Sequence, residues 1–343
     1  MNFDGCGLQI NDAQLALYGE NVARLLNVSG TIHGSAISAE LQKSLKTLRK
    51  RSSLLSAKYK SNDVPPPKYE WLLDNNYLAQ SEGLSCLNDL RGVGKLPRSR
   101  DTAALFSLCL SLVRAGGGKI SRSRCGIFLA GCQSVYSLSR LELSLFVPLL
   151  KAALISELAL LYSEDGENAA EAEAAGVLFS SLRKMATLDY SDVLEKADQT
   201  EQILRRDPAE IYPFMSEKTR EHYKKQVEAL AKANAVPETS VAERVLKLAR
   251  AAGGDARHVG YFLFTKPLGD APAKRSGAIY IGINFGLSLL FSLFFAVVFD
   301  NPAVFLLSLL PFSQLVKSLL DFFLLRVTPP AHIPRMELEN AVP

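Results

Sequence analysis

The apolar residues of this chain recur with a helical period along most of its length. From about Ser38 to Lys60, four leucines share one face with Lys and Arg between them, which is the pattern of an amphipathic helix. These leucines are Leu41, Leu45, Leu48 and Leu55. Further helices are predicted at 13–26, 70–78, 102–114, 124–132 and 139–162, and from Ser216 and Pro237 onwards. Few stretches alternate with a period of two, so we expect an all-α fold.

Proline, glycine and acidic residues mark the expected boundaries of these helices. The region Gly92–Pro97 is interpreted as a loop, and Asp101 as the N-cap of the helix that follows. Pro148 predicts a kink or a break in the long apolar helix over 139–162. Glu164–Ala175 is acidic and rich in alanine, which indicates an exposed turn that leads into a solvated helix face.

The pattern changes near the C-terminus, where charged residues disappear. No Asp, Glu, Lys or Arg occurs from Gly277 to Phe299. As a helix this segment spans about 35 Å, compared with about 30 Å for the hydrocarbon core of a bilayer. Asp300-Asn301-Pro302 forms a turn, and a second apolar run follows from Pro302 to Leu325. We therefore predict a membrane hairpin over 277–325, with arms at 277–299 and 302–325.

The second arm carries two ionisable residues, which leaves two readings open. Lys317 and Asp321 are four residues apart and hence lie on one helix face. Either the arm crosses the bilayer with this face against other helices, or its second half lies along the interface beyond Pro311. We favour the return crossing. In the first arm, Gly282 and Gly286 form a G-x-x-x-G pattern that permits close approach of a neighbouring helix, although such a pair also arises by chance.

Basic residues flank the hairpin and predict its orientation. Lys274 and Arg275 precede the first arm, and Arg326 and Arg335 follow the second. The positive-inside rule places both ends in the cytoplasm. Met1-Asn-Phe-Asp lacks the basic start and apolar core of a signal peptide. We therefore expect a multi-pass protein of the inner (cytoplasmic) membrane whose N-terminal region is cytoplasmic and whose partners include the lipid bilayer.

Composition adds a domain division and excludes one class of partner. Hydrophobic residues make up 48% of the chain and charged residues 22%, as in ordinary globular proteins. We divide the chain into an N-terminal helical segment (1–60), a cytoplasmic helical domain (67–270), the hairpin (277–325) and the start of a linker (326–343). The net charge of +4 is small and dispersed, which argues against nucleic acid as a partner.

Cysteine and histidine residues offer no metal site. Of the five cysteines, four lie among apolar residues on predicted helices, which favours buried free thiols and a reducing compartment. The five are Cys6, Cys86, Cys109, Cys125 and Cys132. The four histidines, His33, His222, His258 and His332, are scattered without ligand-like neighbours. We expect no metal and no other cofactor.

Known catalytic motifs are also missing from the sequence. Gly116-Gly-Gly-Lys119-Ile120 lacks the first glycine of a phosphate loop and has isoleucine where the hydroxyl residue belongs. Glu171 and Glu173 lie in the acidic stretch and are interpreted as surface charge. We therefore assign no catalytic or cofactor-binding residues.

Five residues remain as weak candidates for mutation: Trp71, Asp74, Asn75, His258 and Tyr261. For each of the five, a structural role is the simpler interpretation. Trp71 is expected in the core together with Tyr77, Asp74 as a helix cap or a buried hydrogen-bonding group, and His258 as a packing histidine. Asp74 and Asn75 are expected on the polar side of their helix. No base–nucleophile pair is suggested among the five.

Several segments nevertheless resemble those of one enzyme family. They are Tyr69-Glu-Trp-Leu-Leu-Asp-Asn-Asn-Tyr77, Gln133-Ser-Val-Tyr-Ser-Leu-Ser-Arg-Leu-Glu-Leu143, Arg206-Asp-Pro-Ala-Glu-Ile-Tyr-Pro-Phe-Met215 with Thr219–Glu228, Val241–Ala249 with His258–Leu263, and Leu310–Leu315 with Pro329-Pro330 and Ile333–Leu338. In order and spacing they resemble the N-terminal region of the cyclic β-1,2-glucan synthase family, over roughly residues 20–343. The loop Gly83–Pro97 departs from the family pattern, because it has less charge and Gly92-Val-Gly94 replaces a more aromatic stretch.

The resemblance implies a membrane glycosyltransferase that polymerises glucose from UDP-glucose into a β-1,2-linked glucan. In that family the catalytic domain begins just after the stretch matched by Pro334–Leu338, so the resemblance implies a truncated or split chain whose partner is the catalytic glycosyltransferase domain or subunit. None of the family's catalytic residues has a counterpart here. The rival expectation is a free-standing, membrane-anchored helical interaction module; a third, an independent soluble enzyme, has little support.

Overall fold

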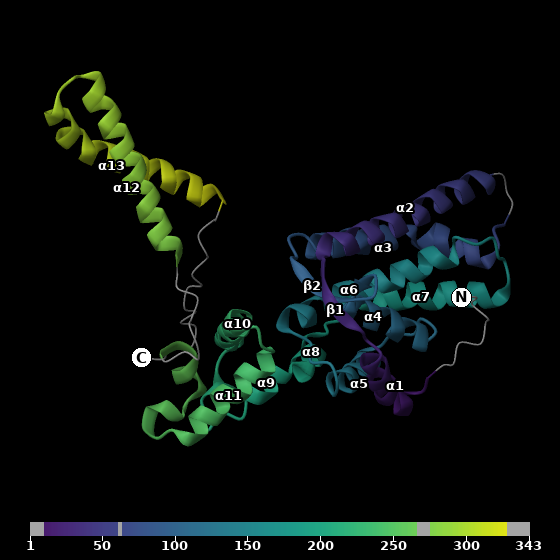
Figure 1. Ribbon diagram of the computed structural model, residues 1–343. Coiled ribbons are helices and arrows are strands. Elements are labelled where there is room, and N and C mark those ends of the chain that lie inside the picture. Colours follow the sequence, from purple (N-terminus) through teal and green to yellow (C-terminus); the bar gives the residue numbers. More distant parts are fainter. Residues whose placement is uncertain (1–9, 61–63, 266–274, 328–343) are drawn as a thin grey trace, which may run out of the picture. The chain divides into compact units, whose positions relative to one another are not determined.

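The computed structural model describes residues 10–60, 64–265 and 275–327 in two compact units, 1–269 and 270–343. In chain order the first unit contains α1 (Asp12–Arg24), β1 (Val28–His33), α2 (Gly34–Lys58), α3 (Pro67–Asp89), β2 (Lys95–Ser99), β3 (Thr102–Ala103), α4 (Ala104–Ala115), α5 (Arg122–Gln133), α6 (Arg140–Leu161), α7 (Ala169–Thr187), α8 (Ser191–Ala197), α9 (Gln199–Leu204), η1 (Tyr212–Phe214), α10 (Glu217–Asn234), α11 (Glu238–Ala251), η2 (Gly254–Arg257) and η3 (Tyr261–Thr265). The second unit contains α12 (Arg275–Val298) and α13 (Pro302–Val327) (Figure 1). The prediction of an all-α fold is confirmed. Both 1–60 and 67–270 fall within the first unit except for residue 270.

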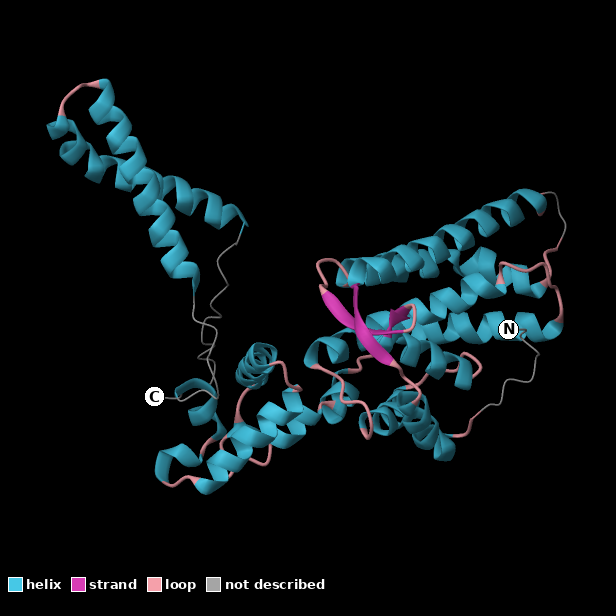
Figure 2. Cartoon of the chain, in the orientation of Figure 1, coloured by secondary structure: helices cyan, strands magenta, loops and turns pink. Residues whose placement is uncertain are grey.

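A short antiparallel sheet is the exception to the helical pattern (Figure 2). Its strand order is β1-β2-β3, and Ile32 pairs with Leu96. The prediction of a loop over Gly92–Pro97 was therefore wrong from Lys95 onward, because buried Leu96 anchors β2 to the core. A strand of five residues containing a proline has too little alternation to be recognised in the sequence.

The start of α4 also differs from the expectation. Asp101 is not its N-cap, because Thr102 and Ala103 form β3 and the helix begins only at Ala104. Ala103 occupies the N-cap position and offers no side-chain hydrogen bond. Sheet pairing of Thr102 with Ser99 has displaced the capped start that the local sequence favoured.

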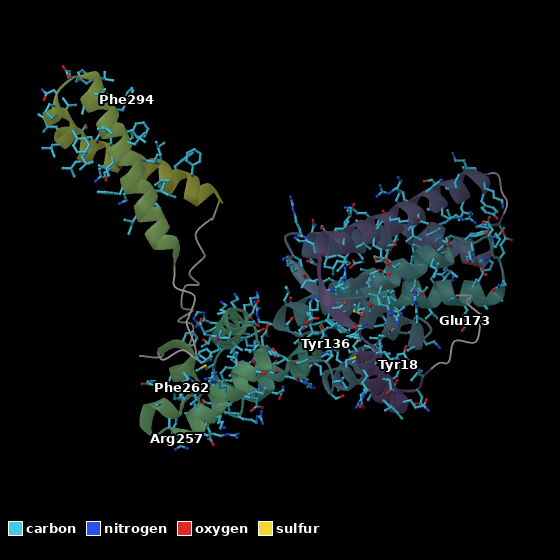
Figure 3. The ribbon with its side chains drawn as sticks, in the orientation of Figure 1. Tyr18, Tyr136, Glu173, Arg257, Phe262 and Phe294 are labelled. Atoms are coloured by element: carbon cyan, nitrogen blue, oxygen red, sulfur yellow. The ribbon has the colours of Figure 1, made fainter. Side chains whose placement is uncertain are left out.

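Helix α6 is the core of the first unit and contacts α2, α3, α4 and α7. It begins with a capping box in which Ser139 and Glu142 bond each other's backbone N–H groups, and Tyr136 donates its OH to Glu142 Oε1 at 2.8 Å (Figure 3). The helix continues through Pro148, so the predicted alternative of a break is wrong. Fully buried neighbours such as Phe146 and Leu149 explain this continuity, because their packing outweighs the one helical hydrogen bond that proline cannot donate.

The leucine periodicity of the 38–60 segment is confirmed. Helix α2 buries Leu41, Leu45, Leu48 and Leu55 against α3 and α6, although it starts earlier than expected, at Gly34. Its N-cap is His33, whose ring accepts the N–H of Ser35 at 3.4 Å. The free-thiol prediction is likewise confirmed for Cys86, Cys109, Cys125 and Cys132, whereas Cys6 lies outside the described residues.

Helices α1 and α5 approach each other closely at two glycines. A Cβ on Gly131 would lie 2.0 Å from the carbonyl oxygen of Ala16, and one on Gly19 would lie 2.6 Å from that of Phe128. Both distances are shorter than any van der Waals contact. The crossing therefore requires glycine at both positions.

A second hydrophobic cluster is built from α9, η1, α10, α11 and η3. A helix begins at Ser216 as predicted, with Ser216 as the N-cap of α10. Pro237, predicted as the first residue of the next helix, is instead the N-cap of α11. Arg140, the first residue of α6, joins this cluster to the α6 core: its Nε and Nη1 donate to Glu228 and Glu221 at 2.9 and 3.1 Å. Burial opposes ionisation of Glu228, but the bonds from Lys232 and Arg140 outweigh it and lower the pKa of Glu228.

The second unit is a helical hairpin, as predicted over 277–325. Helices α12 and α13 pack along each other and are joined by a turn at Phe299–Asn301 (Figure 1). At 1.5 Å per residue they are about 36 and 39 Å long, enough for the hydrocarbon core of a bilayer. Helix α13 passes Pro311 without a break. The predicted linker lies outside the described residues from 328 onward.

Candidate functional site

The surface of the hairpin distinguishes it from the other long apolar helix. Helices α6, α12 and α13 are all long and apolar enough to cross a membrane. In α6, 67% of the apolar stretch is buried inside the protein, whereas the shares are 11% in α12 and 6% in α13. The second unit therefore leaves large apolar side chains uncovered, among them Ile281, Phe285, Leu290, Phe294, Leu306 and Leu310 (Phe294 is labelled in Figure 3). Helix α6 is a core helix, and the hairpin is the segment suited to membrane association.

Within the hairpin, a narrow seam of small and aromatic residues holds the two helices together. The ring of Phe312 lies 5.7 Å from that of Phe291 and 5.0 Å from that of Phe295. Ser288 and Ser292 are buried in the seam, and Ser288 donates its hydroxyl to the carbonyl of Asn284, which also satisfies that hydroxyl away from water. The seam needs few residues, so most of the hairpin surface stays available to lipid or to other helices.

The G-x-x-x-G pattern lies outside this seam. A Cβ added to Gly282 or Gly286 would meet no atom within 4 Å, so neither glycine mediates the contact between α12 and α13. At the open end of the hairpin, Tyr280 instead donates its OH to Asp321 Oδ1 at 2.7 Å. A second, longer bond between the arms runs from Asn284 Nδ2 to the carbonyl of Ser313 at 3.5 Å.

His258 is the centre of a hydrogen-bonded cluster in the first unit. Its Nδ1 lies 2.7 Å from Asp207 Oδ2, and its Nε2 lies 2.9 Å from the OH of Tyr223. The Asp207 carboxylate is buried and accepts three backbone N–H groups as well, from Ile211, Tyr212 and Val259. Burial, followed by the charge of Asp207, raises the pKa of Tyr223, so its OH stays protonated.

The carboxylate–imidazole–phenol order of this cluster is also found in proton-transfer sites, yet the surroundings here favour a structural role. Gly260 leaves no space beside it, since a Cβ there would lie 2.5 Å from the Tyr223 oxygen. His258 was expected to be a packing histidine; in the structure it is also hydrogen-bonded through both ring nitrogens. No local signal in the sequence pointed to Asp207 or Tyr223, because neither is adjacent to His258 in the chain.

A second buried network surrounds Glu201. Its carboxylate accepts bonds from Tyr212, Arg205 and Arg220, each at 2.9 Å. Burial, followed by the charge of Glu201, raises the pKa of Tyr212, which keeps the phenol as a donor. Arg205 and Arg220 also bind Glu195, and Glu201 is 1% exposed. The network therefore fixes α9 against α10 and η1 and leaves Glu201 without access to a substrate.

The α3 candidates occupy other surroundings than expected. Trp71 is 36% exposed and Tyr77 66%, so neither is a core residue. Asn75, expected to be exposed, is buried: it donates to the Trp71 carbonyl at 3.0 Å and accepts from Arg183 at 2.6 Å. Asp74 is exposed and is neither a cap nor a buried hydrogen-bonding group.

The remaining candidate and the acidic pair are also placed by the structure. Tyr261, three residues after His258, is half-buried, and its ring packs edge-on against that of Phe262. Glu173 is exposed, as predicted, whereas Glu171 binds buried Lys68 at 2.8 Å. The interpretation of Glu171 as mere surface charge was therefore wrong, because it neutralises a lysine that is 1% exposed.

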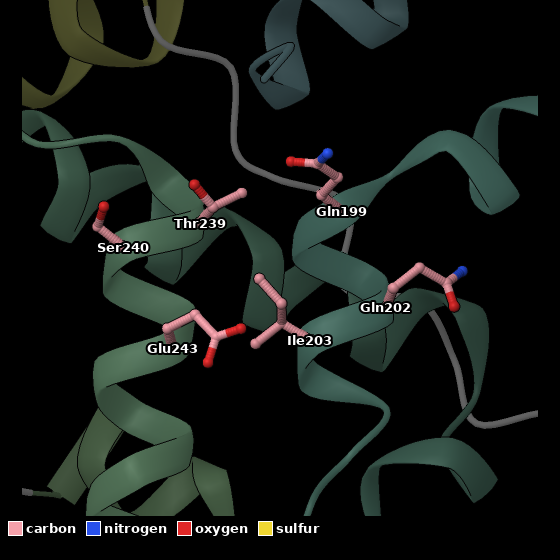
Figure 4. Close-up of a pocket in the computed structure, with 6 residues that line it drawn as sticks. All are labelled: Gln199, Gln202, Ile203, Thr239, Ser240 and Glu243. Atoms are coloured by element: carbon pink, nitrogen blue, oxygen red, sulfur yellow. The ribbon is translucent and has the colours of Figure 1, made fainter. Parts of the chain in front are cut away.

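Neither of the two best-formed hollows on the described surface of the first unit resembles a catalytic cleft. One, of about 490 Å³, lies between α9 and α11 and is lined by Gln199, Gln202, Ile203, Thr239, Ser240 and Glu243 (Figure 4). Its one carboxylate, Glu243, is held by Arg206 at 2.6 Å. The other, of about 580 Å³, lies between α5 and α8, with the Arg122–Asp192 ion pair at its wall. Neither hollow includes His258.

Among the residues that the structure describes, no group of three His, Cys, Asp or Glu side chains is placed to hold a metal ion. Searches for relatives add no assignment: no protein-family model and no curated protein matches the chain. The features that carry an argument about function are thus the uncovered hairpin and the bonded helical unit that precedes it.

Proposed function

We propose that this chain is the non-catalytic scaffold and membrane anchor of a cyclic β-1,2-glucan synthase-like glycosyltransferase. The hairpin of α12 and α13 inserts into the inner membrane, and the helical first unit stays in the cytoplasm. The observation that carries the anchor is the contrast in burial between α6 and the two hairpin helices. A water-exposed surface of this size and apolarity would be aggregation-prone, whereas a bilayer covers it.

The link to glucan synthesis depends on the resembling segments, and the structure supports treating them as one unit. Asp207 lies in the third segment and His258 in the fourth, and they are bonded at 2.7 Å. Arg140 of the second segment binds Glu221 and Glu228 of the third. The matched residues hold one another in place, as expected of a scaffold. Transfer of glucose from UDP-glucose belongs to a catalytic domain or subunit that this scaffold positions at the membrane.

A second candidate function is a free-standing membrane-anchored interaction module. Two exposed apolar residues at η1 favour this second function: Ile211, just before η1, is 50% exposed, and Phe214, its last residue, is 88% exposed. Apolar side chains that protrude in this way are common where a protein partner binds. The two candidates differ in the partner: a glycosyltransferase in the first, and another protein in the second.

Membrane insertion is tested first, with the full-length chain. Leu290→Arg places a charge on the lipid-facing side of α12, which costs about 2.5–3.5 kcal/mol near the centre of a membrane helix. We expect this variant to be released from membranes by alkaline carbonate in a larger fraction than the wild type. Leu84→Arg, on the exposed side of α3, is the matched control and is expected to behave as wild type. Equal release of both variants would contradict the anchor.

The catalytic partner is tested by co-expression with the catalytic region of a cyclic β-1,2-glucan synthase. We expect co-purification of the two and increased incorporation of radiolabelled UDP-glucose into membrane-bound glucan. Removal of 275–327 should abolish that increase. A chain that inserts normally but neither binds the enzyme nor changes incorporation would rule out the glucan-synthase role and leave the interaction module.

A further inference from the structure

One face of α13 is polar although the hairpin around it is apolar. Gln314, Lys317, Ser318 and Asp321 follow the spacing i, i+3, i+4, i+7 and are all exposed. Their neighbours Leu315, Leu319 and Phe322 are exposed as well and apolar. In a bilayer, such a polar stripe is expected to face protein or water and not the lipid chains.

Lys317 has no acidic partner among the described residues of the hairpin. Asp321 is four residues away, a spacing at which the two commonly pair, yet no ion pair forms between them. The described polar contact of the Asp321 side chain is with Tyr280, at 2.7 Å. The Lys317 ammonium can therefore still donate hydrogen bonds, and the neighbouring Asp321 carboxylate can still accept them.

The depth of this stripe argues against simple solvation by headgroups. Lys317 is about 22 Å along the helix from Pro302, and Gln314 about 18 Å, within a hydrocarbon core of about 30 Å. A lysine stem can carry its ammonium to the interface from there, but the shorter Gln314 side chain lies one turn deeper. Gln314 and Lys317 together fit a protein surface better than a lipid one.

We propose that this polar face of α13 is a homodimer interface, in which a second copy of the chain supplies the missing partners. Lys317 of one copy pairs with Asp321 of the other, and the reverse pair forms by symmetry, while Gln314 and Ser318 hydrogen-bond across the contact. The two charges of opposite sign are one helical turn apart, so two parallel copies related by a two-fold axis can pair them diagonally, Lys317 of each with Asp321 of the other. This inference rests on the proposed insertion of the hairpin into the membrane.

The uncovered glycine pair of α12 is the alternative surface for such a contact. Gly282 and Gly286 would also permit close approach, but they carry no charge that selects a partner. If the Lys317–Asp321 surface forms the contact, exchanging these charges should change self-association. A glycine-mediated contact predicts no such change.

The test uses two differently tagged full-length copies, co-expressed, solubilised in mild detergent and captured through one tag. Lys317→Asp leaves two acidic residues on each copy, and Asp321→Lys leaves two basic ones. We expect each variant to lose self-association by about tenfold or more, because like charges then face each other. Lys317→Asp paired with Asp321→Lys should recover association to within about twofold of wild type, since opposite charges meet again.

Two controls keep the result decisive. Carbonate extraction of each variant reports insertion, so a chain that is not inserted overturns the anchor itself and this inference with it. Gly286→Leu blocks the glycine surface and is expected to leave association unchanged. An inserted but monomeric wild type, charge variants that associate like wild type, or a failure of the mixed pair to recover would each overturn the proposed interface, as would loss of association in Gly286→Leu alone.

Discussion

Nδ1 of His258 lies 2.7 Å from Oδ2 of Asp207, a residue 51 positions earlier in the chain. The same carboxylate accepts the backbone N–H of Val259 at 3.0 Å through its other oxygen. Asp207 thereby fastens η2 and η3, the last described elements of the first unit, to the loop before η1. The relationship is structural, and it stabilises the end of the unit that precedes the hairpin.

Removal of the Asp207 carboxylate is expected to destabilise the second hydrophobic cluster. Asp207→Ala leaves two buried and one part-buried N–H group and His258 without an acceptor, and we expect a loss of about 3–5 kcal/mol in the free energy of unfolding. Urea unfolding of the full-length chain in detergent, followed by circular dichroism, measures it. Glu243→Ala breaks an exposed pair with Arg206 and serves as control, with an expected loss below about 1 kcal/mol. Equal losses of stability in the two variants would mean that the Asp207 carboxylate does not hold this cluster together.

The close crossing of α1 and α5 predicts intolerance to a single methyl group. Gly131→Ala places a Cβ 2.0 Å from the Ala16 carbonyl oxygen, so one helix must shift. We expect a loss of about 1–3 kcal/mol in stability. Gly94→Ala is the matched control, because a Cβ there meets no atom within 4 Å. The control should be unchanged or stabilised by about 0.4–1 kcal/mol, and a neutral Gly131→Ala would disprove the close approach.

Buried Lys68 and its partner Glu171 are expected to respond unequally to mutation. Glu171→Ala leaves an ammonium that is 1% exposed without its counter-charge, which we expect to cost about 3–5 kcal/mol. Lys68→Met leaves Glu171, which is 27% exposed and can be hydrated. The methionine variant should therefore retain more stability than the alanine variant. Thermal unfolding of both gives the order, and a reversed order would contradict this account.

The buried thiols predict low reactivity and an alkaline limit to stability. Burial raises the pKa of Cys86, Cys125 and Cys132 from 9.0 to about 12, and that of Cys109 as well. Because the folded pKa lies above the unfolded one, this contribution is complete below about pH 9 and is lost as pH rises towards 12. The unfolded chain then gains from ionising its thiols, and the folded chain does not.

Alkylation with iodoacetamide at pH 8, read out by peptide mass, tests the predicted low reactivity of the thiols. The four thiols should label slowly in the folded protein and quickly in guanidinium chloride. Urea midpoints should fall between pH 9 and pH 11, and by less in a Cys86→Ala variant. Rapid labelling of the folded chain would contradict the burial of these thiols.

Much of the helical pattern could be predicted because it depends on local properties. The leucines of α2, the cap at Ser139 and the long charge-free run of α12 can each be recognised within one or two dozen residues of sequence. The contacts of the candidate site could not be recognised from such short segments. Asn75 looked like an exposed polar residue, yet Arg183 bonds its side chain from a helix 108 residues away. Similarly, neither Asp207 nor Tyr223 has a sequence context that indicates His258 as its partner.

The sequence by itself determined where helices and the apolar hairpin would form, because helix caps, periodicity and a lack of charge act over short distances. It did not decide which apolar helix is core and which is uncovered: α6 and α12 are both long and apolar, and only the packing of α2, α3, α4 and α7 around α6 separates them. Tertiary structure also formed the β1–β2 sheet, the Lys68–Glu171 pair and the Asp207–His258 lock. Each of these joins residues far apart in the chain, and folding brings them within bonding distance.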